Sequence, residues 1–112
     1  MVKNKTQTTW QRAKKIIPGG NMLLSKRPEI FLPEKWPAYF KSAKDCYVTD
    51  LDGKKYLDMS LMGVGTCVLG YSNNEIDKAV IKNIKRGNMS TLNCEEEYLL
   101  SKKLLKINKW AD

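Results

Sequence analysis

The chain has 112 residues, of which 42% are hydrophobic, and its formal net charge is +8. This length allows one compact domain and is too short for two ordinary ones. No apolar stretch approaches the roughly 20 residues needed to cross a bilayer, and no apolar signal-peptide core precedes Pro18. The sequence therefore argues against a membrane span and against secretion.

The positive charge is concentrated near the amino terminus. Residues 1–29 carry seven lysines or arginines and a single acid, Glu29, whereas residues 41–60 carry four of each sign. A basic segment poor in acids is typical of an organellar presequence or a polyanion-binding arm, and equally of a solvated helix face. Lysines outnumber arginines in this segment and no Arg-aromatic platform accompanies them, which favours the solvated face.

The chain contains no histidine, and its three cysteines, Cys46, Cys67 and Cys94, form no Cys-x-x-Cys pair. Zinc sites and disulfide frameworks need closer or paired ligands, so we predict no metal site. Without histidine, Ser-His-Asp and Cys-His catalysis are also excluded. The cysteines are expected to be structural residues of a reducing cytoplasm.

In chain order, the first predicted element is a short helix over residues 9–17, with Thr8 or Thr9 as its cap. Trp10, Ala13 and Ile17 recur on it at helical spacing, and the Pro-Gly-Gly of residues 18–20 stops it. Prolines 28, 33 and 37 remove backbone donors and disfavour helix before them, so an extended connector is expected from Asn21 to Pro37.

Residues 38–60 have the pattern of antiparallel strands. A short strand begins at Tyr39-Phe40, and Asp52-Gly53 then joins two runs, Cys46–Asp50 and Lys55–Met59, as a hairpin turn. Asp50 and Asp52 could form an acid/base dyad, but a carboxylate before glycine has a backbone-bonding role in turns, which explains the pair better. Gly63, Gly65 and Gly70 follow, and predict a tight loop.

Two helices are predicted after this loop. Ser72-Asn73-Asn74-Glu75 matches a capping box, and Gly87 ends the helix that it starts. Ile76, Ala79, Val80 and Ile84 form the apolar stripe of that helix. The second helix opens at Asn93, with three glutamates in its first turn and lysines toward its end. Its predicted buried stripe is Leu100, Leu104 and Ile107.

The ordered pattern Tyr-x-x-Asp-x-Asp-Gly-x-x-Tyr-Leu-Asp of residues 47–58, followed by Leu69-Gly70, resembles the amino-terminal region of class III pyridoxal-phosphate-dependent aminotransferases. Within that family it is most similar to the glutamate-1-semialdehyde aminomutase branch, and the resemblance runs from about Trp10 to Asp112. It implies an α/β fold: the amino-terminal part of a fold-type-I transferase, with a helix, a small-domain hairpin and two helices that lead to a large domain.

On this resemblance the chain divides into five segments. They are a basic helix with the Pro-Gly-Gly loop (1–20), an extended connector (21–37), small-domain strands (38–60), a glycine-rich cavity loop (61–72) and two helices leading to the large domain (73–112).

The resemblance also suggests substrate-side residues. In the aminomutases Pro-Gly-Gly is followed by an arginine that resembles a clamp for the substrate carboxylate, and here Arg27, with Ser25, stands near that position. An arginine fork binds carboxylate in a bidentate manner, although a loop arginine can equally serve packing. Gly63 and Val64 stand where the branch often reads Ser-Trp-Gly-Pro. The tryptophan of that pattern is absent here, so the substrate is expected to differ from glutamate semialdehyde.

In the family, the phosphate-gripping loop and the Schiff-base lysine lie beyond the position matched by residue 112. We therefore predict no catalytic and no cofactor-binding residue within this chain, and no activity of the chain alone. The full-length enzyme is expected to be a homodimer that uses pyridoxal 5'-phosphate (PLP) to transfer an amino group to or within an amino-acid, keto or aldehyde substrate. Two alternatives stay open: an independent interaction module, favoured by cooperative unfolding as a monomer, and a basic nucleic-acid-binding protein, favoured by steep salt dependence.

Overall fold

The computed structural model describes residues 4–60, 62–87 and 90–111. Lys3 of the basic segment and Leu61 of the predicted cavity loop therefore lie outside the described residues. The chain divides into two compact units, residues 1–73 and residues 74–112, and each is treated by itself. Every helix in the described ranges is too short or too polar to traverse a bilayer.

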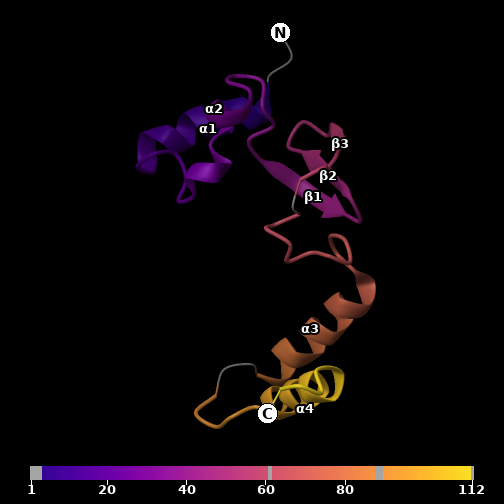
Figure 1. The fold of residues 1–112 in the computed structure, drawn as a ribbon. Helices are drawn as coiled ribbons and strands as arrows, with labels where there is room; N and C mark the ends of the chain where they lie inside the picture. The colour runs from indigo at the N-terminus through magenta and orange to yellow at the C-terminus, as the bar shows by residue number, and fades with distance from the viewer. Residues whose placement is uncertain (1–3, 61, 88–89, 112) are drawn as a thin grey trace. The chain divides into compact units, whose positions relative to one another are not determined.

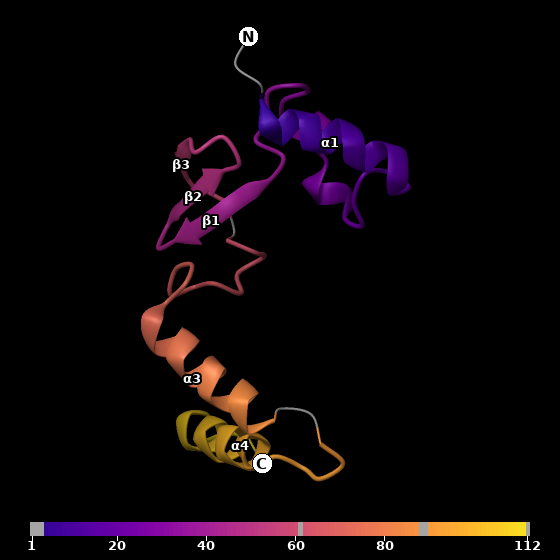
Figure 2. The same ribbon diagram turned by 180° about the vertical axis from the view of Figure 1, so that it is seen from behind.

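Unit 1 holds the first three helical segments and the sheet (Figures 1 and 2). Its elements are α1 (Lys5–Ile16), the 3-10 turn η1 (Leu24–Lys26), α2 (Pro28–Phe31), β1 (Phe40–Lys44), β2 (Tyr47–Asp50) and β3 (Lys55–Leu57). The strands form an antiparallel sheet in the order β1-β2-β3. Val48 of the central strand lies opposite Ala43 on one side and Tyr56 on the other. The predicted hairpin is confirmed.

Helix α1 begins four residues earlier than predicted, and its cap is Asn4 rather than Thr8 or Thr9. The Asn4 side chain accepts a hydrogen bond from Gln7 N at 3.0 Å. The carboxylate of Asp52, in the β2–β3 turn, also accepts from Lys5 N at 2.9 Å and from Thr6 N at 3.2 Å. These bonds satisfy first-turn amides that would otherwise lack partners. The sequence could not reveal a cap supplied from 47 residues away.

The connector of residues 21–37 is not extended throughout, so that prediction was wrong. It contains η1 and α2, and Pro28 occupies the first turn of α2. Proline has a fixed φ near the helical value, and its missing N–H is not needed in the first turn of a helix. Proline therefore favours the start of a helix, although it disfavours helix in the residue before it. The segment therefore folds back toward α1. Gln7 Nε2 donates a hydrogen bond of 2.5 Å to Trp36 O, which lies 29 residues away in the sequence.

The core of unit 1 is small and lies under α1. Trp10 and Ala13 are its buried hydrophobic residues, with Thr6, Pro28 and Asp50 also buried among the described residues. Trp10 and Ala13 share one helix face, as predicted, whereas Ile17 stays 42% exposed at the helix end. Burial of one face of α1 therefore fixes its position on the rest of unit 1.

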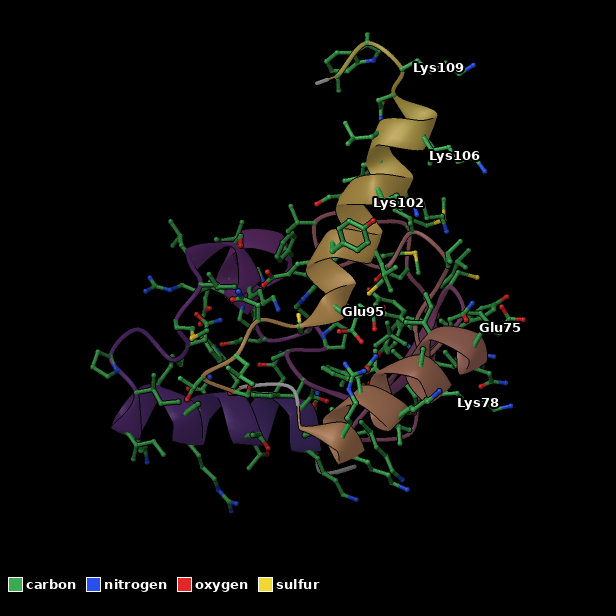
Figure 3. The ribbon with its side chains drawn as sticks, turned by 90° about the horizontal axis from the view of Figure 1, so that it is seen from below. Glu75, Lys78, Glu95, Lys102, Lys106 and Lys109 are labelled. Atoms are coloured by element: carbon green, nitrogen blue, oxygen red, sulfur yellow. The ribbon has the colours of Figure 1, made fainter. Side chains whose placement is uncertain are left out.

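Unit 2 consists of α3 (Asn74–Arg86) and α4 (Glu95–Ile107). Helix α3 begins within the predicted capping box, with Ser72 two residues before it at a left-handed φ of 52°, and Gly87 ends it at a φ of 90°. Helix α4 begins at Glu95 rather than Asn93, because Cys94 takes the cap position with an extended backbone. Figure 3 shows Lys106 and Lys109 pointing away from the ribbon at the end of α4.

The prediction that the apolar stripe of α4 is buried was wrong. Leu100, Leu104 and Ile107 are all more than 45% exposed, and neither α3 nor α4 has a buried residue. Periodicity identifies the apolar face of a helix but not whether anything covers it. Within the described residues of unit 2, that face remains open.

Candidate functional site

The Pro18-Gly19-Gly20 loop places Arg27 against its backbone. Gly19 and Gly20 both have left-handed φ values, 75° and 82°, which favour glycine. A Cβ on Gly19 would lie 2.2 Å from Arg27 Nη2, and one on Gly20 would lie 2.4 Å from Trp10 Cη2. Each glycine therefore leaves the space that a large neighbouring side chain occupies.

A short polar network supports this loop from beneath. Trp10 Nε1 donates to Glu29 Oε1 at 2.7 Å, and Lys14 Nζ donates to the same oxygen at 3.1 Å. The hydrogen bond from Trp10, followed by one from the backbone, lowers the pKa of the Glu29 carboxyl. Glu29 is therefore an anion already engaged by Trp10 and Lys14, and it forms no ion pair with Arg27.

The Arg27 side chain is half-buried and its Nε is enclosed without a hydrogen-bond acceptor. No acidic side chain in the described ranges forms an ion pair with it. Asn21 Oδ1, in the same loop, is likewise enclosed without a donor. A buried polar atom left unpaired costs free energy, so these two atoms mark a local loss of hydrogen bonding in the loop.

The other predicted substrate-side residues lie in two different places. Ser25 is exposed within η1, two residues before Arg27. Gly63 and Val64 lie in the glycine-rich loop at φ values of 77° and 61°, and Val64 is 86% exposed. Hydrogen bonds within the loop, from Thr66 N and Oγ1 to Gly63 O, keep it tight as predicted.

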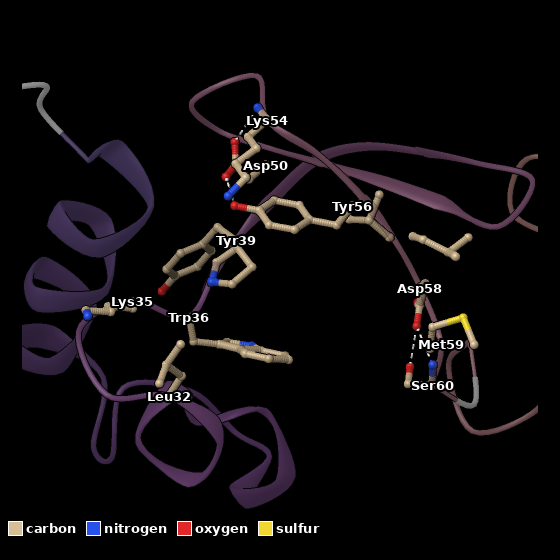
Figure 4. A pocket seen from close by; sticks show the side chains of 13 residues that line it. Leu32, Lys35, Trp36, Tyr39, Asp50, Lys54, Tyr56, Asp58, Met59 and Ser60 are labelled. Carbon is tan, nitrogen blue, oxygen red and sulfur yellow. Dashed lines mark hydrogen bonds between the residues drawn. The ribbon is translucent and has the colours of Figure 1, made fainter.

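A cavity of about 760 Å³ lies elsewhere in unit 1 (Figure 4). It is lined by Leu32, Lys35, Trp36, Pro37, Tyr39, Val48, Asp50, Lys54, Tyr56, Leu57, Asp58, Met59 and Ser60. Neither Arg27, Ser25, Gly63 nor Val64 is among these residues. The sequence did not predict this cavity, because its lining combines segments that lie apart in the chain, such as Trp36 and Tyr56.

The carboxylates of this cavity serve structure rather than chemistry. Asp50, only 5% exposed, accepts from Asp52 N, Lys54 N and the Tyr56 hydroxyl, all at 2.9 Å. Partial burial and then this bond to Asp50 raise the pKa of the Tyr56 hydroxyl. Asp50 is therefore the turn-forming carboxylate that the sequence predicted, whereas Asp52 supplements the Asn4 cap of α1.

Asp58 forms the second network of the cavity. Its Oδ1 accepts from Ser60 N and Ser60 Oγ, and its Oδ2 accepts from the Tyr71 hydroxyl at 2.5 Å. The Ser60 and Tyr71 bonds lower the pKa of Asp58, and the same contact raises the pKa of Tyr71 to about 12. Strand β3 ends at Leu57, just before Asp58 and two residues before the predicted end.

The described residues contain no group of side chains that could hold a metal ion. Cys46, Cys67 and Cys94 are free thiols.

Comparisons with known proteins identify relatives over nearly the whole chain. The 3-aminobutyryl-CoA aminotransferase of Cloacimonas acidaminovorans is 37% identical over 101 residues, which are 89% of this chain and 24% of that protein. The glutamate-1-semialdehyde 2,1-aminomutase of Methanocaldococcus jannaschii is 33% identical over 92% of this chain and 23% of its own length. No protein-family model matches.

The fold has solved relatives as well. A structure of the PLP internal aldimine form of the Sphingopyxis sp. MTA144 FumI protein superposes with a TM-score of 0.75 and 28% identity. The match covers 87% of this chain and 23% of the FumI chain. The chain thus spans about a quarter of the length of the proteins that it matches.

Proposed function

Because this chain belongs to the class III pyridoxal-phosphate-dependent aminotransferases and matches an amino-terminal portion of them, we propose that it forms the substrate-side part of an enzyme that transfers an amino group to or within a carbonyl compound. The observation that carries the proposal is the 37% identity with an aminotransferase over 89% of the chain. A matching transaminase-like fold supports it.

We propose Arg27 as the residue that binds an anionic group of the substrate. The Arg27 side chain is half-buried, and no acidic side chain among the described residues forms an ion pair with it. It lies on the loop that the hydrogen bond from Trp10 to Glu29 supports. A planar fork of this kind suits a carboxylate. Ser25, Gly63 and Val64 are proposed to line the same substrate side; the exposure of Ser25 and Val64 leaves both side chains accessible.

The substrate is proposed to be a small amino-carbonyl compound with an anionic group. The name of the semialdehyde aminomutase supports this class, because glutamate 1-semialdehyde keeps a free carboxylate. The 3-aminobutyryl-CoA of the other relative is an amino compound whose acyl carboxyl is a thioester, so its anionic groups are the phosphates of coenzyme A. We further propose that the enzyme is a cytoplasmic homodimer. The many exposed large hydrophobic residues, such as Leu100 and Leu104, are consistent with surfaces that further polypeptide covers.

PLP would supply the electron sink for amino transfer. The lysines described in this chain do not fit the attachment of PLP, because each has an exposed side chain. An amine in water stays protonated at neutral pH and is a poor nucleophile until it is desolvated or placed beside other cations. We therefore propose that the lysine and the phosphate-binding groups are supplied by polypeptide equivalent to the rest of the relatives.

A hybrid enzyme tests the proposal. Residues 10–111 would replace the matching segment of the Cloacimonas enzyme, and PLP absorbance and turnover of 3-aminobutyryl-CoA and of glutamate 1-semialdehyde would be measured. We expect a hybrid that binds PLP and transfers amino groups from at least one of these substrates. A matched hybrid with Trp10→Ala should lose folding and activity together. A hybrid that folds and binds PLP but transfers no amino group would contradict the proposal.

A further inference from the structure

The contact between Arg27 and Gly19 has a consequence beyond packing. The guanidinium lies so close to Gly19 that an added Cβ would meet Nη2 at 2.2 Å, Cζ at 3.1 Å and Nε at 3.7 Å. All three are atoms at the far end of a flexible side chain. The steric clash of a methyl group at position 19 can therefore be relieved by moving the guanidinium, and the left-handed φ of 75° adds a backbone strain that any substitution there shares.

Gly20 provides the contrast within the same loop. A Cβ there would meet Trp10 Cη2 at 2.4 Å and Cζ3 at 2.6 Å. Trp10 is only 3% exposed and is tied to Glu29, so it cannot move aside. A side chain at position 20 would disturb the packing of Trp10 and so lower the stability of the fold. A side chain at position 19 would mainly displace the Arg27 guanidinium.

The position of this guanidinium matters because the group is poised to bind an anion. Its Nε is enclosed without an acceptor, and no acid in the described ranges neutralises it. Glu29, two residues away in sequence, already accepts from Trp10 and Lys14. Because the side chain as a whole is only half-buried, a carboxylate would meet the Nη groups of the guanidinium rather than the enclosed Nε, through charge-assisted hydrogen bonds.

We propose that Gly19 is a positioning residue: the absence of a side chain there lets the Arg27 guanidinium lie on the loop backbone, in the position from which it binds a carboxylate. This inference rests on the proposed substrate-side role of Arg27 and adds the residue that determines where its guanidinium lies. It separates two effects of a substitution at position 19, a small effect on stability and a large one on carboxylate binding.

The test uses the whole chain and does not depend on amino transfer. The Arg27 Nε–H resonance would be followed by NMR during titration with acetate, against chloride at equal ionic strength to remove screening effects. In the wild-type chain acetate, and not chloride, should shift this resonance. In Gly19→Ala we expect the acetate Kd to rise by about tenfold, the equivalent of one lost charge-assisted hydrogen bond.

Gly53→Ala is the matched control, since Gly53 also has a left-handed φ, 87°, but nothing lies within 4 Å of the added methyl group. Both variants should lose similar stability, and only Gly19→Ala should lose acetate binding. Arg27→Lys, which keeps the charge without the fork, should lose it too. Three results would overturn the inference: no acetate response in the wild-type chain, equal binding by Gly19→Ala, or unfolding of Gly19→Ala while Gly53→Ala folds. None of these bears on the hybrid enzyme.

Discussion

The two units of this chain are organised by different kinds of interaction. In unit 1, side chains far apart in sequence hydrogen-bond to one another: Asp52 caps α1 through Thr6, and Trp10 donates to Glu29. In unit 2, α3 and α4 have no buried residue. The interactions described within this unit are helical hydrogen bonds and a surface ion pair. Unit 1 therefore positions its own side chains, whereas the apolar faces of the unit 2 helices stay exposed.

Removal of the Trp10 side chain should have the largest effect on this contrast. Trp10 fills the space beside Gly20 and is one of the two buried hydrophobic residues described in unit 1. We expect Trp10→Ala to lower the free energy of unfolding by about 3–5 kcal/mol, as for other buried aromatic truncations. Urea unfolding followed by far-UV circular dichroism measures this change.

Trp110→Ala is the matched control in unit 2. Trp110 is 84% exposed, so its truncation should change the free energy of unfolding by no more than about 0.5 kcal/mol. Equal effects of the two substitutions would break the comparison, since they would mean that Trp10 is no better packed than a surface residue.

The second prediction concerns the pH dependence of unit 1. The hydrogen bond to Asp58, followed by partial burial, raises the pKa of Tyr71 from 10.0 to about 12. Because the folded value lies above the unfolded one, the stabilisation is fully present below pH 10 and is lost as the pH rises through 12. The free energy of unfolding of the wild-type chain should therefore fall more steeply over this range than that of Tyr71→Phe.

Asp58 provides the opposite limb of the same profile. Its pKa is lowered from 3.8 by Ser60 and Tyr71, so its contribution is present above pH 3.8 and is lost as the pH falls through the folded value. Asp58→Asn should flatten the acid limb, and Tyr71→Phe should flatten it in part. Lysine titration is common to all three proteins and cancels in the comparison. Parallel profiles for wild type and both variants would show that the contact carries no pH-dependent stability.

Local patterns predicted the elements of this fold better than their surroundings. The Asp52-Gly53 turn, the helix stop at Gly87 and the glutamates opening α4 are all short-range signals, and the structure confirms each. The start of α1 and the burial of the Leu100 face were predicted wrongly. The Asn4 cap of α1 is a local signal that the prediction missed, whereas the covering of an apolar helix face depends on partners about which periodicity carries no information.

The candidate site shows the same division. A Pro-Gly-Gly motif with a following arginine pointed to Arg27, yet the close approach to Gly19 could not be read from spacing. The cavity beside Trp36 and Tyr56 was missed because its lining combines residues 32–39 with residues 48–60, which lie farther along the chain. The resemblance provided the family of this chain, whereas the position of each side chain required the structure.

The smallest expected effect is in unit 2. Arg86 Nη2 contacts Glu96 Oε1, and the two side chains are 57% and 44% exposed. Exposed pairs are screened by water and salt, so Arg86→Ala should lower the unfolding midpoint by no more than about 2 °C, and by less at high salt. Thermal unfolding at low and high salt measures both quantities. A much larger, salt-insensitive loss would mean that this pair organises unit 2 as the Asp52 cap organises unit 1, and the contrast between the two units would then no longer hold.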